Sequence, residues 1–413
     1  MNQSGFYTII CILGLAASFS PVQSRANFPG LPIILVPGDG GTQLWAKLNK
    51  TESVHYWCSK TTNDYFSLWL NLQLLLPEVL DCFVDNMRLV YNETTHTTAN
   101  SPGVDIQIRD FGNTSSVENL DTSQHSATKY FADIIQNAVK WGYTRGKDLR
   151  GAPYDFRRAP NEFGKFYENL TKLIEDTYYH NNNKKVVLVG HSMGNPTLLY
   201  FLNNKPQTWK DKFIKAFVSI SGPWGGSMKI LLLFASGYNL DHYTFVIPPL
   251  KIRTEQRSMT SSAFLMPTDK FWHPNETLVV TPEKNYTVND YETFFNDSDY
   301  YTGWQMYQDT KDLVYDLKPP GVEFHALYGT GLQTPAQFVY GKGQFPDSQP
   351  TTIYGEGDGT VNLRSLLGFR QWKKQQKQPV YEKIFPNNEH LSILRNQNIS
   401  EYIKEIVLPS HNH

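Results

Sequence analysis

The sequence has little charge and few cysteines. Charged residues make up 19% of its 413 positions, and 38 Lys and Arg against 39 Asp and Glu leave a formal net charge of −1. Because binding to nucleic acid depends on a basic excess that neutralises phosphates, we expect no nucleic-acid partner. The 24 Phe, 24 Tyr and 9 Trp argue against a disordered or fibrous chain. The length fits one large domain with insertions, or two domains.

No apolar run in the sequence is long enough to cross a membrane. Residues 6–19 form an apolar stretch that is shorter than the roughly 20 residues a membrane-spanning helix needs. The stretch has the length of the apolar core of a secretory signal, so we expect residues 1–24 to be a cleaved signal peptide. The protein is therefore predicted to enter the secretory pathway and to stay in the lumen of that pathway or to leave the cell.

The cysteine pattern agrees with this route. Cys11 is lost with the signal, which leaves Cys58 and Cys82. In an oxidising compartment these two most simply form one disulfide, and two unpaired buried thiols are the alternative. Eight Asn-x-Ser/Thr sequons beyond the predicted signal peptide predict a glycoprotein, and they begin at Asn49, Asn92, Asn113, Asn169, Asn275, Asn285, Asn296 and Asn398.

Short apolar runs alternate with amphipathic stretches along much of the chain. The former are typical of buried strands, and apolar residues spaced by three and four are typical of helices. The alternation predicts a parallel sheet covered on both faces, with the active site at the carboxyl ends of its strands. Residues 228–315 break the alternation and are predicted to form a cap. The predicted strands are 31–36, 185–189, 216–220 and 322–328, and the predicted helices are 131–139 and 166–174.

A glycine-flanked pentapeptide is the clearest catalytic motif. Residues 190–194 read Gly-His-Ser-Met-Gly and directly follow a predicted strand. This is the pattern of a nucleophile elbow, a sharp turn whose glycines avoid collisions and leave the serine hydroxyl exposed. An ordinary turn serine is the alternative. The elbow predicts an α/β-hydrolase fold with Ser192 as the nucleophile, and a structural role for His191.

A serine hydroxyl is a weak nucleophile that needs a base, and the base needs an acid to orient it. On this fold both follow the serine in the order acid, then histidine. Asp358 and His390 fit that order, whereas Glu356 and Glu389 are competing acids. We favour Asp358 because the Gly-Thr-Val that follows it suits a tight loop after a strand. A calcium-binding loop over residues 356–362 is the alternative, but the ligand spacing of an EF-hand is missing there. We expect neither a metal nor an organic cofactor.

Acyl transfer also needs hydrogen-bond donors that stabilise the negative charge that develops on the carbonyl oxygen. Backbone N–H groups held in place before the reaction supply such donors. We expect one from Met193, the residue after the nucleophile, and the other from the loop 37–39, where glycine permits close approach.

These motifs lie within longer blocks of sequence that match one known protein family. The chain resembles the lecithin–cholesterol acyltransferase family, and within it the lysosomal phospholipase A2 (group XV) branch. The resemblance implies that Ser192, Asp358 and His390 are nucleophile, acid and base, and that Asp39 and Met193 are the oxyanion donors. The blocks run through nearly the whole mature chain and comprise residues 35–39, 69–77, 141–146, 150–158, 191–195, 250–253 and 357–362.

The resemblance further implies that Cys58 and Cys82 close a membrane-binding hairpin, and that residues 236–250 form a lid. The plasma acyltransferase branch has a second disulfide that this chain cannot form, which favours the lysosomal branch. The resulting domain boundaries are a hydrolase core over 25–57, 99–227 and 316–413, interrupted by a membrane-binding subdomain over 58–98 and a cap with its lid over 228–315.

Nine of the twelve residues from 65 to 76 are apolar. The segment either packs into the core or lies in a lipid interface. The two flanking cysteines and the resemblance favour the interface. The expected partners are a phospholipid surface, lipid substrates and alcohol acceptors, and the protein is expected to be a monomer. The predicted membrane-binding residues are Trp69, Leu70, Leu72, Leu74 and Leu75.

The predicted activity is that of a serine phospholipase A and acyltransferase, which passes an acyl group from a glycerophospholipid to water or to a lipid alcohol. The resemblance implies ceramide as one such alcohol. The alternatives are a secreted phosphatidylcholine–sterol acyltransferase and a non-catalytic lipid-binding module. We expect an acidic optimum, because protonation of eleven histidines takes the charge from −1 to at most +10 and favours anionic lipid. His390 must then keep a low pKa to stay a base.

Overall fold

The computed structural model describes residues 30–123, 126–239 and 247–408. The predicted signal peptide, residues 1–24, lies outside these ranges, and so do residues 240–246 of the predicted lid. No helix within the described ranges is long and apolar enough to cross a membrane.

The centre of the fold is a sheet of six strands in the order β15-β12-β9-β8-β1-β7, and every neighbouring pair is parallel. The four predicted strands are confirmed as β1, β8, β9 and β12. Every residue of β1 and β8 is buried, as expected of a parallel strand covered on both faces. The bounds are β1 Ile33–Val36, β7 Leu149–Gly151, β8 Val186–His191, β9 Ile214–Ile220, β12 Glu323–Thr330 and β15 Val380–Pro386.

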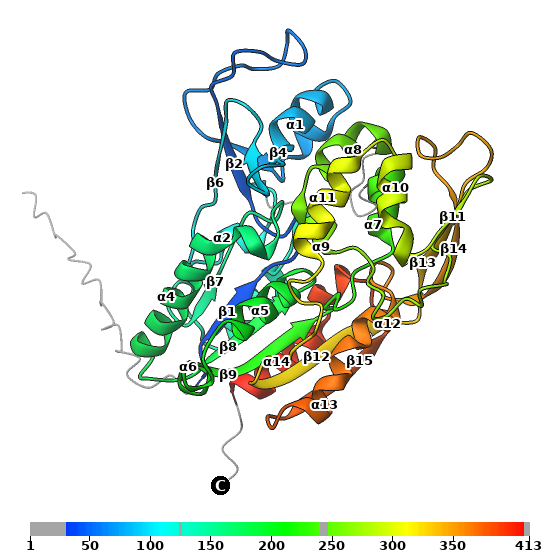
Figure 1. Cartoon of the computed structure of the whole chain (residues 1–413). Coiled ribbons are helices and arrows are strands. Elements are labelled where there is room, and N and C mark those ends of the chain that lie inside the picture. The colour runs from blue at the N-terminus through cyan, green and yellow to red at the C-terminus, as the bar shows by residue number, and fades with distance from the viewer. Residues whose placement is uncertain (1–29, 124–125, 240–246, 409–413) are drawn as a thin grey trace, which may run out of the picture.

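Helices cover both faces of this sheet (Figure 1). α3 and α14 contact each other on one face, and α4, α5 and α6 pack along β8 and β9 on the other. The predicted helix 131–139 is α3, and the predicted helix 166–174 is part of α4, which ends before Asn181. The bounds are α3 Ala132–Lys140, α4 Gly164–His180, α5 Gly194–Asn203, α6 Gln207–Phe213 and α14 Gln397–Val407.

A smaller substructure follows β1. It contains the antiparallel sheet β3-β2-β6, the hairpin β4–β5 and the helix α1. A disulfide joins Cys58 to Cys82, with 5.5 Å between the Cα atoms, so the predicted pairing is confirmed and the alternative of two free thiols is wrong. The bounds are β2 Leu44–Leu48, β3 Phe66–Trp69, α1 Leu80–Met87, β4 Leu89–Asn92, β5 Thr97–Asn100 and β6 Val104–Gln107.

The segment predicted as a cap is mainly helical. Helices α7 to α11 lie together beyond one end of the central sheet, next to a four-stranded sheet in the order β11-β10-β13-β14 (Figure 1). The bounds are α7 Lys229–Ser236, α8 Pro249–Arg257, α9 Thr260–Phe264, α10 Tyr291–Asp297, α11 Tyr301–Thr310, β10 Val279–Val280, β11 Asn285–Tyr286, β13 Leu332–Val339 and β14 Thr351–Gly357; short helices elsewhere are α2 Ser115–Glu118, α12 Leu363–Leu366 and α13 Trp372–Gln375.

The apolar segment 65–76 lies mostly in the interior. The prediction that its side chains reach a lipid surface is wrong for three of the five residues named. β3 pairs with β2, and the turn that follows folds back against α1, so that the segment packs inwards. The buried side chains are those of Trp69, Leu70 and Leu75, and the half-buried ones are those of Leu72 and Leu74.

Candidate active site

The turn after β8 has the geometry of a nucleophile elbow. Ser192 adopts a φ of 50°, in the left-handed region that a non-glycine residue seldom occupies. Its backbone N–H donates to the carbonyl of Ile220, which ties the turn to β9. α5 begins at Gly194, where a Cβ atom would lie 2.4 Å from the carbonyl oxygen of Pro37. The elbow therefore needs this glycine, because another loop of the chain lies directly against it.

Three side chains from distant parts of the chain meet at this turn. Nε2 of His390 lies 2.8 Å from the hydroxyl of Ser192, and Nδ1 of His390 lies 2.7 Å from a carboxylate oxygen of Asp358. A carboxylate only accepts, so Nδ1 carries a proton and donates to Asp358, and the neutral Nε2 accepts from the serine hydroxyl. The arrangement is able to remove the hydroxyl proton and hold it on the imidazole.

Of the candidate acids, Asp358 is the one that reaches the imidazole. It is fully buried after β14, and its second carboxylate oxygen accepts from two backbone N–H groups of its own loop. Its backbone carbonyl also accepts from the N–H of His390. Glu356 is instead exposed on β14, and the Glu389 carboxylate accepts from two backbone N–H groups that follow it.

A second hydrogen-bonded chain, which the sequence did not reveal, runs beside these three residues. The N–H of Gly38 donates to the hydroxyl of Tyr130, which in turn contacts Nδ1 of His191. Nε2 of His191 lies 2.9 Å from the backbone carbonyl of His390. A carbonyl only accepts, so Nε2 carries a proton, and in a neutral imidazole Nδ1 then accepts from Tyr130. His191 thus has a structural role, since it joins the loop 37–40 to the loop of His390.

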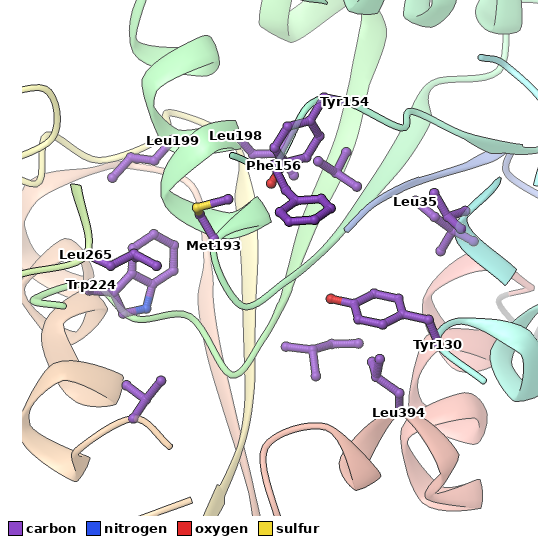
Figure 2. Close-up of a cluster of buried hydrophobic side chains, with 14 of the residues drawn as sticks. Leu35, Tyr130, Tyr154, Phe156, Met193, Leu198, Leu199, Trp224, Leu265 and Leu394 are labelled. Atoms are coloured by element: carbon purple, nitrogen blue, oxygen red, sulfur yellow. The ribbon is translucent and has the colours of Figure 1, made fainter. Parts of the chain in front are cut away.

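The loop 37–40 is pressed against the elbow. A Cβ atom on Gly38 would lie 2.6 Å from Cβ of Ser192, which only a glycine avoids. The side chain of Met193 is buried in a cluster of apolar side chains beside α5, which holds the residue after the nucleophile in place (Figure 2). Within the described residues, the backbone N–H groups of Asp39 and Met193 have no hydrogen-bond acceptor. Both are therefore available to an incoming oxygen atom.

A largely apolar pocket opens over Ser192. Trp69 forms part of its wall: the indole N–H donates to the carbonyl of Gly40 at 2.7 Å, and the ring packs against Phe156. This explains why Trp69 is not available to a membrane surface. The pocket is wide and apolar enough to take a hydrocarbon chain next to the hydroxyl. Its apolar lining includes Trp69, Met87, Leu120, Phe156, Ile230, Leu233, Met259 and Leu265.

His390 and Asp39, which both line the pocket, have shifted proton affinities. Burial acts to lower the pKa of His390, but the charge of Asp358 and the hydrogen bond to it outweigh burial, and the pKa is raised. The expectation that this pKa is held low is therefore wrong. Asp39 lines the pocket and is exposed to solvent as a residue, but its carboxyl still loses hydration beside the pocket wall. Desolvation raises the pKa of Asp39 to about 6, although a hydrogen bond from the backbone of Gly40 acts to lower it.

Comparison with known proteins identifies the family of this chain. A family model described as Lecithin:cholesterol acyltransferase matches residues 65–397. Human "Lysosomal phospholipase A and acyltransferase" is 50% identical over 404 residues, which cover 98% of this chain and 96% of that protein. The bovine protein of the same name is 49% identical over 400 residues, with 97% and 96% coverage. Chicken "Phosphatidylcholine-sterol acyltransferase" is 43% identical over 364 residues, with 88% and 87% coverage.

One solved structure, the crystal structure of the Tle4-Tli4 complex, contains a chain that superposes with a TM-score of 0.51 at 13% identity. The match covers 90% of this chain and 96% of that chain, and the likeness concerns the fold alone. The predicted α/β-hydrolase fold is confirmed by the parallel sheet, by the elbow and by this likeness. The family model matches most of this chain, and the human and bovine relatives are 50% and 49% identical to it over nearly its whole length. The chain therefore belongs to the lecithin:cholesterol acyltransferase family.

Proposed function

We propose that this protein is a serine phospholipase A and acyltransferase that acts on glycerophospholipids. The observation that carries the proposal is the continuous hydrogen-bonded series from Ser192 through His390 to Asp358 beside an apolar pocket. The relatives that match nearly the whole chain are named as a phospholipase A and acyltransferase, which supports both a phospholipid substrate and transfer of its acyl group.

The reaction steps follow from the geometry. The hydroxyl oxygen of Ser192 attacks the carbonyl carbon of an acyl ester while its proton passes to Nε2 of His390, and Asp358 stabilises the imidazolium. The N–H groups of Asp39 and Met193 donate to the oxyanion. The ester C–O bond then breaks, the leaving oxygen takes the proton from His390, and an acyl-serine ester remains. Water or a lipid alcohol repeats the sequence, which releases a fatty acid or a new ester and restores the serine.

Vesicles that contain a glycerophospholipid, ceramide and cholesterol together test this activity. Mass analysis of all acyl products is expected to find free fatty acid, lysophospholipid and acylceramide. Sterol ester as the dominant product would instead favour a phosphatidylcholine–sterol acyltransferase. A folded protein that forms no acyl product would favour a non-catalytic lipid-binding module.

We also propose a lysosomal destination, because the human and bovine relatives carry that word in their names. Glycosylation fits the positions of the sequons: seven of the eight asparagines are exposed, and Asn169 is half-buried. The balanced charge supports the proposal that no nucleic acid is bound. The protein is proposed to act as a monomer on a lipid surface.

The lipid-binding surface is proposed to lie around the disulfide rather than along β3. Four exposed apolar side chains gather there, and Tyr56 and Trp57 are exposed by 94% and 52%. The indole N–H of Trp57 donates to the carbonyl of Glu78, which holds the two segments beside the disulfide together. Exposed aromatic and aliphatic side chains of this kind bind at lipid interfaces. We call these four residues the interfacial patch: Val54, Tyr56, Trp57 and Leu76.

Replacing both Tyr56 and Trp57 by serine is expected to weaken binding to anionic vesicles by at least about tenfold, because two aromatic rings no longer enter the interface. Hydrolysis of a water-soluble short-chain ester should not change, since the change lies outside the pocket. Vesicle sedimentation in a Ser192→Ala background measures the binding. In the same assay, binding should rise on acidification as histidines gain charge.

Tyr179→Ser is the matched control for the interfacial patch. Tyr179 is exposed by 54%, but it lies on α4, far from the loops around α1 in Figure 1. This variant should bind vesicles as the wild type does. If the double variant also binds like the wild type, the interfacial patch is not the lipid-binding surface.

We propose that the enzyme is active at acidic pH for a reason other than a low pKa of His390. Below about pH 6 the carboxyl of Asp39 is neutral, which removes a negative charge from beside the proposed oxyanion donors. Activity is lost as the pH falls through the pKa of His390, because the base becomes protonated. A bound lipid displaces water from the pocket that His390 lines, and this loss of hydration acts to lower the pKa of His390.

The acid limb of the kcat profile is therefore expected at a lower pH than the acid limb of kcat/KM, which reports the free enzyme. Initial rates between about pH 4 and 9, at saturating and at low substrate, measure the two limbs. Acid limbs that coincide would contradict a shift of the His390 pKa on lipid binding.

A further inference from the structure

An acidic side chain without a partner lines the pocket. Glu255, on α8, is 4% exposed, and its Oε2 atom is buried with no hydrogen-bond partner among the described residues. It shares the pocket with Ser192 and His390. A buried polar atom without a partner is rare, because losing its hydration without compensation costs free energy. Glu255 is thus suited to bind a group that enters the pocket from outside.

The surroundings of Glu255 keep its carboxyl neutral. Desolvation and the charge of Asp39, with Arg157 acting in the opposite sense, raise the pKa of Glu255 to about 8. Arg157 is committed elsewhere: its guanidinium donates to the carboxylate of Asp155 and to two further oxygen atoms. A neutral carboxyl is a hydrogen-bond donor, so its fitting partner is an uncharged oxygen acceptor.

The elements packed against α8 add few charges to the pocket. α8 packs against α1 and α7. The acids of α1, Asp81 and Asp85, form ion pairs with lysines, and Lys229 of α7 donates to two hydroxyl groups. Of these three, only Lys229 lines the pocket. The lining includes the apolar side chains of Met87, Phe156 and Met259, which offer no donor to an oxygen atom. The polar side chains of Gln256 and Ser262, which also line the pocket, already donate to backbone carbonyls.

We propose that Glu255 is a substrate-binding residue, whose neutral carboxyl donates a hydrogen bond to the carbonyl oxygen of the acyl ester that is not cleaved. The proposal rests on the proposed function, since it requires a glycerophospholipid with two ester carbonyls. The oxygen of one carbonyl accepts hydrogen bonds from the oxyanion donors beside Ser192. The other is a neutral acceptor that must enter a largely apolar pocket, where it needs a donor to replace water.

The test uses a diacyl glycerophospholipid and its analogue in which an ether replaces the ester that is not cleaved. The analogue lacks the second carbonyl. Wild-type protein is expected to prefer the diacyl substrate in kcat/KM by about tenfold, the effect of one hydrogen bond in a buried site. Glu255→Leu should remove this preference. Glu255→Gln should retain it, because the amide keeps both the shape and a donor.

Three controls separate binding from folding and from chemistry. Glu255→Leu should not lower the Tm, because an apolar side chain replaces an unpartnered buried carboxyl. Glu405→Leu, the same substitution at an exposed position of α14, should leave the preference unchanged. Labelling of Ser192 by a fluorophosphonate, which has no second ester carbonyl, should proceed at the same rate in Glu255→Leu, Glu255→Gln and Glu405→Leu.

The outcomes distinguish the two proposals. A preference that persists in Glu255→Leu, or that disappears in Glu255→Gln, overturns the role of Glu255. Full phospholipid turnover by a folded Ser192→Ala variant overturns the proposed function itself.

Discussion

Ser192→Ala is expected to lower kcat for phospholipid turnover by about a millionfold, which leaves only the residual catalysis that binding and the oxyanion donors provide. The reason is that the hydroxyl 2.8 Å from Nε2 of His390 is the proposed attacking group, and no acyl-enzyme forms without it. The Tm should change by no more than about 2 °C, since a single half-buried hydroxyl oxygen is removed and the backbone turn is preserved. Vesicle hydrolysis followed by mass analysis, together with thermal unfolding, measures both quantities.

Ser221→Ala is the matched control for this prediction. Ser221 directly follows β9, is fully buried and adopts a φ of 51°, close to the 50° of Ser192, but its hydroxyl has no hydrogen-bond partner among the described residues. Its replacement tests whether loss of a buried serine hydroxyl on a left-handed turn is itself harmful. The control variant should keep most of the activity. Comparable losses in the two variants would mean that the Ser192 effect reports folding rather than catalysis.

Asp358→Asn is expected to lower kcat by about ten-thousandfold with the fold intact. The asparagine oxygen is able to keep the two backbone N–H bonds that Asp358 accepts now. Its amide nitrogen, however, is a donor, so Nδ1 of His390 has to become the acceptor and the ring proton moves to Nε2. The imidazole then no longer accepts the proton of Ser192.

Glu356→Gln is the corresponding control, because it makes the same chemical change at the competing acid two residues earlier. Glu356 is exposed on β14, so kcat should stay within about twofold of the wild type. If Glu356→Gln lost activity and Asp358→Asn retained it, the assignment of the acid would be reversed. Both variants are compared at several pH values, since a wrong tautomer lowers kcat at every pH in the active range.

The central strands were predictable because their signal is local. A buried parallel strand must be apolar along its whole length, and the run before Gly190 satisfies this requirement without reference to any other part of the chain. The helices of the cap were not predicted, because they are short and their stability comes from packing against distant segments. β13 and β14 were missed for a similar reason: the Pro335 bulge and the exposed polar residues of β14 weaken the strand pattern.

The segment 65–76 shows the limit of counting apolar residues. Its composition fits a buried strand and a lipid-facing surface equally well, and the pairing of β3 with β2 decided for the interior. The exposed pair Tyr56 and Trp57 escaped notice because two aromatic residues among polar ones carry no periodic signal.

By itself, the sequence determined the elbow at Ser192, the position of His390 after the acid and the family, and it favoured the pairing of Cys58 with Cys82 that the structure then confirmed. These follow from short motifs and from chain order, which need no knowledge of distances. Only the tertiary structure decided between Asp358 and Glu356, joined Tyr130 to His191, set the direction of the His390 pKa and placed Glu255 at the pocket. Hydrogen bonds act over about 3 Å, and desolvation depends on the atoms that surround a group, so both are properties of residues that folding alone brings together.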